Sequence, residues 1–149
     1  MKIAIDVMGG DNFPEANIDG VFEYIEDSNN PNVDFYLVGN QLLIENYLKN
    51  KNKQSKHITI INAEEIISDD DRPSRIFKTK PNCSIVKSIE LLQNKDVDAV
   101  ISAGNTGALL STSLFLVGKI ESIKRPALAP YIPSSKKGFI LCDAGANVD

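Results

Sequence analysis

Short β-branched apolar runs alternate along this chain with longer segments in which apolar residues recur at helical spacing. The short runs predict strands over residues 2–7, 33–38, 57–61, 97–101 and 139–142. The longer segments predict helices over residues 14–26, 40–48, 83–92 and 108–117. Strands that alternate with helices in this way favour an α/β fold with a mostly parallel sheet.

Two segments depart from this alternation. Residues 63–80 mix short apolar pieces with three consecutive aspartates and several basic residues, so their pattern predicts no single element. Residues 125–133 form a run interrupted by prolines, which suits an edge strand or an extended passage. Because a short turn joins this run to the strand over 139–142, the two can pair antiparallel.

Three of the predicted strands end in small-residue turns rich in Gly, Asn and Asp, at residues 6–11, 102–107 and 143–147. If these strands are parallel and belong to one sheet, their carboxyl ends share an edge, where such sheets bind ligands. Turns without bulky side chains leave backbone N–H groups open to an anion. We therefore expect the three turns to meet around one crevice that binds an oxyanion.

The middle turn, Gly104 to Gly107, lies where the helix over 108–117 is expected to begin. Free N–H groups and the positive end of the helix dipole favour phosphate or carboxylate there, and Asn105 and Thr106 add short polar side chains. The alternative is a plain helix cap in a tight turn. This turn has neither the lysine of a P-loop nor the GxGxxG spacing, so taken alone it leaves both interpretations open.

Composition and charge exclude several classes of function. The chain is 42% apolar and 24% charged, and its net charge of -4 with interspersed signs argues against a nucleic-acid partner. The first strand begins within two residues of Met1 and no apolar run approaches a membrane span, so we expect a cytoplasmic protein. Cys83 and Cys142 are far apart and predict neither a disulfide framework nor a zinc site, and Cys142 is expected in the core.

The length of 149 residues is that of one domain, so residues 1–149 are predicted to form a single α/β domain portion. The chain stops directly after a predicted strand and its glycine turn, where a doubly wound domain would begin another helix. We expect it to be truncated relative to a longer protein.

Other polar residues carry weaker hypotheses. His57, the only histidine, is expected at the start of a strand and away from the ligand edge, which disfavours a Ser-His-Asp triad. The aspartates at 69–71 favour a solvated turn over a metal site. Three further aspartates, near strand ends, either cap turns or orient groups at the site: Asp6, Asp11 and Asp143. A basic group forms either a solvated face or an arm over the crevice: Arg72, Arg75, Lys78, Lys80 and Lys87.

Four blocks of the sequence resemble one family, the bacterial phosphate acyltransferases of phospholipid synthesis (the PlsX family). They are residues 3–11 with Pro14, residues 100–109, residues 125–128 and residues 143–149, and they follow one another in the family's order. The similarity covers all 149 residues but only the amino-terminal part of the family's chain. One departure is Cys83, which stands where the family usually has the first of two serines, whereas Ser84 carries over.

The resemblance implies a three-layer α/β/α fold like that of phosphotransacetylases and of isocitrate and isopropylmalate dehydrogenases. It implies transfer of a fatty acyl group from acyl carrier protein to inorganic phosphate, which gives acyl phosphate for phospholipid synthesis. Because phosphate is the nucleophile, no Ser or Cys of the enzyme need be acylated, and no cofactor is implied. Family members are homodimers that associate peripherally with membranes, and no amphipathic anchor is evident in this portion.

For this chemistry we hypothesise roles for individual residues. The candidate catalytic residues are Asn105, Lys80 and Ser84: Asn105 would hold phosphate with Thr106 and the Gly104 to Gly107 amides, and Lys80 and Ser84 would steady it or the thioester oxygen as negative charge develops. The candidate substrate-binding residues are Gly9, Gly10, Asp11, Gly104, Thr106, Gly107, Asp143 and Asn147. Arg72, Arg75 and Lys78 are candidates for docking the acidic carrier protein, and no residue is assigned to a metal.

Two rival functions stay open. A nicotinamide-dependent dehydrogenase of related fold would need an acidic residue after a GxGxxG turn, and none presents itself here. The second rival is a non-catalytic fragment that binds phosphate or carrier protein without turnover.

Overall fold

The computed structural model of the chain describes residues 1–27, 32–68, 70–124 and 126–142. The chain forms two compact units, Met1–Val117 and Gly118–Asp149. The first unit carries the elements that surround the predicted crevice. The second contains the short Pro-interrupted segment.

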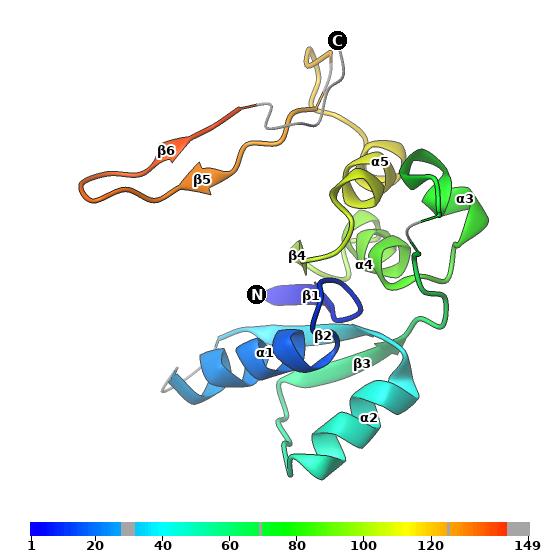
Figure 1. Cartoon of the computed structure of the whole chain (residues 1–149), viewed down its shortest axis with the longest axis vertical. Helices are drawn as coiled ribbons and strands as arrows, with labels where there is room; N and C mark the ends of the chain where they lie inside the picture. The colour runs from blue at the N-terminus through cyan, green and yellow to red at the C-terminus, as the bar shows by residue number, and fades with distance from the viewer. Residues whose placement is uncertain (28–31, 69, 125, 143–149) are drawn as a thin grey trace. The chain divides into compact units, whose positions relative to one another are not determined.

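A four-stranded parallel sheet forms the centre of the first unit (Figure 1). Its strands are β1 (Lys2–Asp6), β2 (Asp34–Gly39), β3 (Ile58–Asn62) and β4 (Ala99–Ser102). They lie in the order β3-β2-β1-β4, and each neighbouring pair is parallel. The chain therefore builds the sheet outward from β1 on one side and then returns to add β4 on the other.

Helices cover both faces of this sheet (Figure 1). On one face α1 (Glu15–Asp27) and α2 (Gln41–Asn50) pack against the strands through Ile18, Leu37 and Ile44, which are fully buried. On the other face α4 (Ser84–Gln93) packs Leu91 and Leu92 against Ala4 and Val38. Burying each large aliphatic side chain contributes about 1.5–3 kcal/mol, which stabilises the layers. The predicted three-layer α/β/α fold with a parallel sheet is confirmed.

A second layer of helix lies outside α4. Helix α5 (Thr106–Leu116) packs against α4 and against the short helix η1 (Pro73–Arg75), which continues into α3 (Ile76–Thr79). Ile76 is fully buried in a cluster with Val86 and Ala108. Three apolar residues of the segment 63–80, whose pattern predicted no single element, thus belong to this separate small core: Ile67, Ile76 and Phe77.

Asn40 caps the start of α2, where the sequence predicts a helix to begin. Its side-chain oxygen accepts a hydrogen bond from the Leu43 amide at 3.1 Å. Such a cap satisfies one of the amides that have no partner inside a helix.

None of the helices in the described ranges combines the length and the apolar composition that a membrane span needs.

The second unit contains a two-stranded sheet. Strands β5 (Tyr131–Ile132) and β6 (Phe139–Ile140) pair antiparallel, as the Pro-bounded run predicts. The expectation that this last strand joins the parallel sheet is wrong, because β6 pairs only with β5 among the described strands. Cys142 is exposed and not in a core, since neither strand of this small sheet has a buried residue.

Candidate functional site

The sheet has a topological switch point between β1 and β4. The connection after β1 leads to β2 on one side, and β4 lies on the other side of β1. Open α/β sheets bind ligands at the carboxyl ends of the two strands that flank such a point. Here those ends lead into the first two of the predicted small-residue turns.

A cavity of about 330 Å³ lies between these two turns. Its lining comes from the turn after β1, the turn after β4, the start of α4 and the segment 66–68: Asp6, Met8, Gly9, Gly10, Asp11, Phe13, Ile66, Ile67, Ser68, Ser84, Ile85, Ala103, Gly104 and Asn105. The prediction that distant turns meet at one crevice is confirmed for these two. The third turn, with Asp143 and Asn147, lies outside the described residues.

The two turns meet through close contact of their backbones. A Cβ atom on Gly9 would lie 2.5 Å from the Gly104 amide nitrogen and 2.7 Å from the Gly104 Cα. Since these are backbone atoms, only a residue without a side chain fits. Gly10, the next residue, has φ +87°, a conformation that glycine adopts without strain.

A chain of hydrogen bonds joins the same turns. The Ser102 hydroxyl donates to Asp6 Oδ2 at 2.6 Å and accepts from the Gly104 amide at 3.0 Å. The other carboxylate oxygen, Oδ1, accepts from the Met8 amide at 3.1 Å. Asp6 and Ser102 are also register partners at the end of the β1–β4 ladder. The last residue pair of the ladder thus fixes both turns.

Asn105 caps α5. Its side-chain oxygen accepts from the Ala108 amide at 2.9 Å, so the plain helix-cap interpretation of this turn is correct for that oxygen. The amides of Thr106 and Gly107 lie in the first helical turn and have no acceptor within the helix. They and the Asn105 side-chain amide are the donors that this turn can offer to a ligand.

Thr106 and Gly107 do not line the cavity. A Cβ on Gly107 would lie 3.0 Å from the Pro73 side chain, and Ser111 donates to the Pro73 carbonyl at 2.7 Å. The small size of Gly107 therefore lets α5 pack against η1. Packing against η1 therefore explains why residue 107 is a glycine, which the sequence pattern did not show.

Ser84 and Cys83 are neighbours in different surroundings. Ser84, the first residue of α4, is 5% exposed and lines the cavity, where it was predicted. Cys83 is fully buried among Ile76, Ile85 and other apolar residues. Burial raises the pKa of its thiol, so the thiolate is disfavoured at neutral pH.

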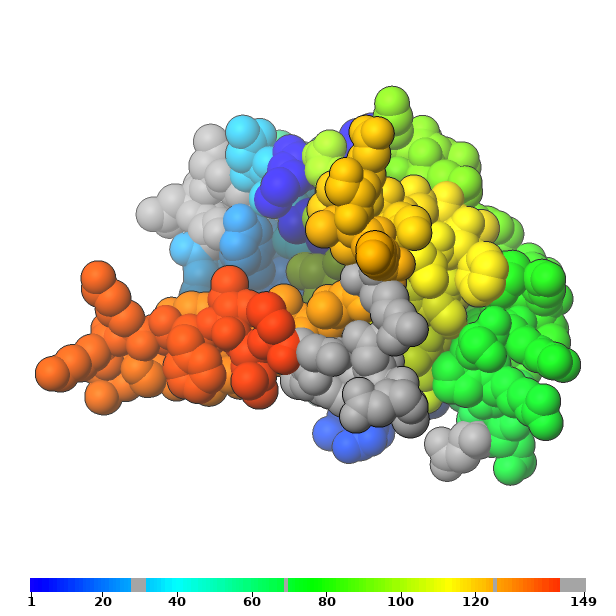
Figure 2. Space-filling view, turned by 90° about the horizontal axis from the view of Figure 1, so that it is seen from above, coloured from blue at the N-terminus to red at the C-terminus, as the bar shows by residue number. Residues whose placement is uncertain are grey.

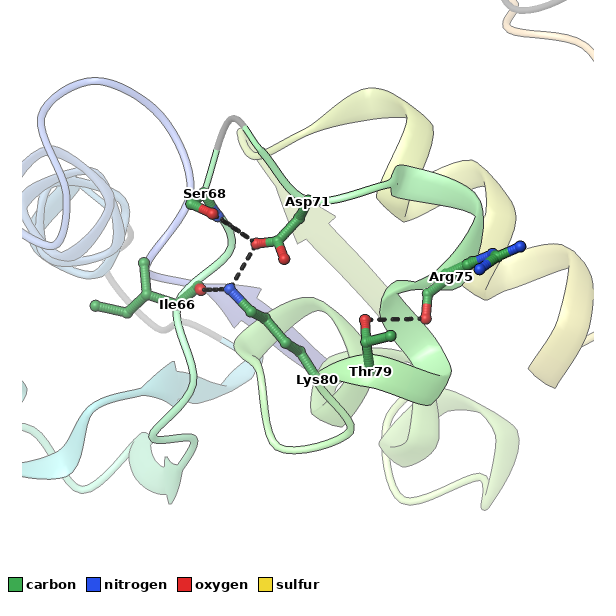
Figure 3. A network of polar contacts seen from close by, with 6 residues as sticks. All are labelled: Ile66, Ser68, Asp71, Arg75, Thr79 and Lys80. Atoms are coloured by element: carbon green, nitrogen blue, oxygen red, sulfur yellow. Dashed lines mark hydrogen bonds and ion pairs between the residues drawn. The ribbon is translucent and has the colours of Figure 1, made fainter.

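Lys80 is not part of the cavity lining, but it contacts Ile66, which is, and Asp71 (Figure 3). Its ammonium donates to the Ile66 carbonyl at 2.6 Å and to Asp71 Oδ2 at 2.5 Å. The same Asp71 oxygen accepts from the Ser68 amide and hydroxyl, at 2.7 and 2.9 Å. These bonds, led by that from Lys80, lower the pKa of Asp71 to about 2. Lys80 thus holds the segment that forms one wall, and Asp71 is an ion-pair partner.

The predicted docking residues lie on the surface. Arg72, Arg75 and Lys78 are exposed, and within the described ranges none of them forms an ion pair.

His57 is at the start of β3, where it was predicted, and its Nδ1 lies 3.0 Å from Asp34 Oδ1. That pair is at the amino ends of the strands, opposite the cavity.

Sequence reasoning missed three parts of the site. The cavity wall at Ile66, Ile67 and Ser68 comes from a segment without periodicity, and a single parallel bridge from Glu65 to Cys83 holds it in place. Ser102 was part of a predicted turn but had no role. Asp6 was noted only as one of three aspartates near strand ends, and its position as the last residue of a buried strand was the available signal.

The charge of the lining is negative. Asp6 and Asp11 line the cavity, and the described lining contains no lysine or arginine. Donors to an anion would therefore be backbone amides, the Ser84 hydroxyl and the Asn105 amide. No group of three or more His, Cys, Asp and Glu that could hold a metal ion occurs among the described residues.

Comparison with known proteins gives a consistent result. The family model described as fatty acid synthesis protein matches residues 1–149. Proteins named phosphate acyltransferase match over 100% of this chain: that of Bacillus subtilis strain 168 is 46% identical, that of Enterococcus faecalis 41% and that of Dictyoglomus thermophilum 43%. The chain spans 44% of the length of each of these relatives. Because the family model matches from the first residue to the last, the chain belongs to the fatty acid synthesis protein family.

Proposed function

We propose that this chain is the amino-terminal part of an enzyme that transfers a fatty acyl group to inorganic phosphate. The observation that carries the proposal is the cavity at the switch point, where two small-residue turns meet in a chain similar to proteins named phosphate acyltransferase. A donor thioester on acyl carrier protein and an acyl phosphate product, used for phospholipid synthesis, complete the proposed reaction.

The chemistry asks little of the protein beyond placement and charge stabilisation. A phosphate oxygen bonds to the thioester carbonyl carbon, the carbon–sulfur bond breaks, and the departing carrier thiolate takes a proton. Negative charge develops on the carbonyl oxygen before that bond breaks, and preorganised donors lower this barrier most. A buried neutral Cys83 is compatible with this route, because no enzyme thiol is acylated.

We assign the donors to residues at the cavity. The Asn105 side-chain amide and the Ser84 hydroxyl would hold phosphate, with Gly9, Gly10 and Asp11 forming the facing wall. Lys80 would add positive charge if it exchanged Asp71 for the anion. Asp143 and Asn147 would contribute from the third turn.

The test of these roles is turnover in the natural protein, with acyl phosphate trapped as hydroxamate. Asn105→Ala should slow turnover by roughly 100-fold, since one lost donor to a developing oxyanion costs about 3 kcal/mol in the barrier. Asn40→Ala is the matched control, because Asn40 caps α2 in the same way and lies outside the cavity lining. It should lower stability by about 1 kcal/mol and leave turnover unchanged.

Lys80→Ala should also slow turnover. Lys87→Ala is its control, because Lys87 pairs with Glu90 on the same helix at 3.3 Å and lies outside the cavity lining. Unchanged turnover in both Asn105→Ala and Lys80→Ala would remove these assignments.

For the carrier protein, we propose the surface of η1 and α3. Arg72, Arg75 and Lys78 are exposed there, and Phe115 of α5, 60% exposed, stacks on Phe77 with ring centroids 4.3 Å apart. Figure 2 shows the surface of α5 (yellow) beside that of η1 and α3 (green). An exposed aromatic ring bordered by basic groups suits a partner that is acidic and presents some apolar surface.

Charge reversal tests this surface. Arg75→Glu with Lys78→Glu should weaken carrier binding and flatten its dependence on salt, because fewer opposite charges meet. The control changes two exposed lysines in the connection between α2 and β3, Lys51→Glu with Lys56→Glu, and so matches the change in net charge. Full affinity in the first variant would place the carrier on another surface.

A further inference from the structure

Asp6 is a buried carboxylate at the edge of the cavity. It is 1% exposed, and among the described residues it forms no ion pair with a lysine or arginine. Removing an ionised carboxylate from water is costly unless hydrogen bonds replace the lost hydration. Hydrogen bonds from the Met8 amide and the Ser102 hydroxyl supply that replacement.

The Ser102 hydroxyl both donates and accepts. It has one proton, which it donates to Asp6 Oδ2 at 2.6 Å. The Ser102 oxygen then presents its lone pairs elsewhere, and it accepts from the Gly104 amide at 3.0 Å. One carboxylate therefore sets the orientation of one amide in each turn, that of Met8 directly and that of Gly104 through Ser102.

Both orientated amides precede groups that line the cavity. Met8 is followed by Gly9 and Gly10, and Gly104 is followed by Asn105 at the start of α5. The Asp6 Oδ2 atom lies 2.9 and 3.0 Å from the positions that a Cβ would take on Gly9 and Gly104. The carboxylate thus lies behind the point where the two turns touch, and it is covered by them.

We propose that Asp6 and Ser102 are positioning residues for the anion site. They hold the two turns at a fixed separation, so that Gly9 and Gly10 of one turn and the Asn105 side chain of the other line one cavity. Both act through the backbone and not by contact with the substrate. This inference rests on the proposed function, since it concerns the phosphate of that reaction.

The experiment measures phosphate dissociation constants by calorimetry and steady-state KM and kcat for phosphate and acyl donor in the natural protein. Ser102→Ala should weaken phosphate binding, and raise KM for phosphate, on the order of 10- to 100-fold, as for loss of a hydrogen bond to a charged group. KM for the acyl donor should stay unchanged. Ser102→Thr, which keeps a hydroxyl on the same carbon, should restore most of the phosphate affinity.

Asp6→Asn gives an independent test. It keeps the size of the side chain but removes the charge that directs the Ser102 proton, so phosphate affinity should fall as in Ser102→Ala. Ser88→Ala is the control, because Ser88 is fully buried in α4 and its hydroxyl has no hydrogen-bond partner among the described residues. It should leave phosphate affinity unchanged.

Three outcomes overturn the inference. The first is a wild-type dissociation constant in Ser102→Ala. The second is a lower kcat with unchanged KM for both substrates, in proportion to a lower melting temperature. This pattern marks a structural role alone. The third is no phosphate binding by the wild-type protein, which also ends the proposed function. Phosphate binding without acyl transfer would instead end only the proposed reaction, and a weaker binding of Ser102→Ala would then still support the positioning role.

Discussion

At the scale of single residues, the contact between the two turns depends on the absence of a side chain at Gly9. The Gly104 backbone occupies the space that a Cβ would need, and backbone atoms at the end of a paired strand cannot move without disturbing the β1–β4 ladder. Sequence reasoning explained this glycine by its open amide. The structure adds a packing reason that acts even without a ligand.

Gly9→Ala should lower the free energy of unfolding by about 1–3 kcal/mol, because it forces a backbone shift in a packed site. Gly20→Ala is the matched control. Gly20 lies within α1 and has no atom within 4 Å of an added Cβ, so alanine there should stabilise the protein by about 0.5–1 kcal/mol. Urea unfolding of both variants measures the difference. Equal stability of the two variants would contradict the contact.

At the scale of elements, the Lys80–Asp71 pair joins the segment 66–71 to the connection between α3 and α4. Lys80 directly follows α3, and its ammonium contacts both the Ile66 carbonyl and Asp71 (Figure 3). Its described residues, 66–68 and 70–71, belong to no strand or helix, so these side-chain bonds and the neighbouring Glu65–Cys83 bridge hold it. One wall of the cavity therefore depends on an ion pair.

The pKa of Asp71 tests this connection. Because the folded protein lowers it to about 2, from about 3.9 in an unfolded chain, the ion pair stabilises the fold above about pH 4 and is lost as the pH falls toward 2. Lys80→Met should return the Asp71 pKa toward its ordinary value. Titration of the Asp71 carboxyl carbon by NMR gives both values. An ordinary pKa in the wild-type protein would show that the pair does not form in solution.

At the scale of the whole molecule, the cavity described here has donors but an unfavourable charge. Two carboxylates line it, and Lys80, the lysine of the Figure 3 network, is paired with Asp71. The relatives named phosphate acyltransferase are more than twice as long as this chain. We infer that turnover needs groups beyond these 149 residues.

The mass of the natural protein tests that inference. We expect intact-mass spectrometry to give a value above the 16.3 kDa of this chain. We also expect phosphate-dependent turnover from the longer protein and none from the 149 residues alone. A natural mass of 16.3 kDa with no turnover would favour the non-catalytic binding fragment, and turnover by the short chain would contradict the need for further groups.

Local pattern determined much of the fold. The β-branched runs placed the four strands of the sheet within two residues of their observed bounds, because alternation of apolar runs and helical spacing reflects burial within each element. The helix caps at Asn40 and in the turn before α5 could also be predicted from the sequence. A hydrogen bond from an amide to a side chain three residues away is a local interaction. Strand order was not readable, because pairing of β4 with β1 joins residues almost 100 positions apart.

The sequence by itself determined which residues form the turns after β1 and β4, that these residues are small and polar, and the family to which their motifs point. Only the tertiary structure decided that two of these turns touch, that Asp6 and Ser102 join them, that Gly107 packs on Pro73 and that Lys80 pairs with Asp71. The reason is physical. Composition and hydrophobic periodicity reflect how each residue is buried within its own element. A contact between elements depends on distances that no local pattern contains.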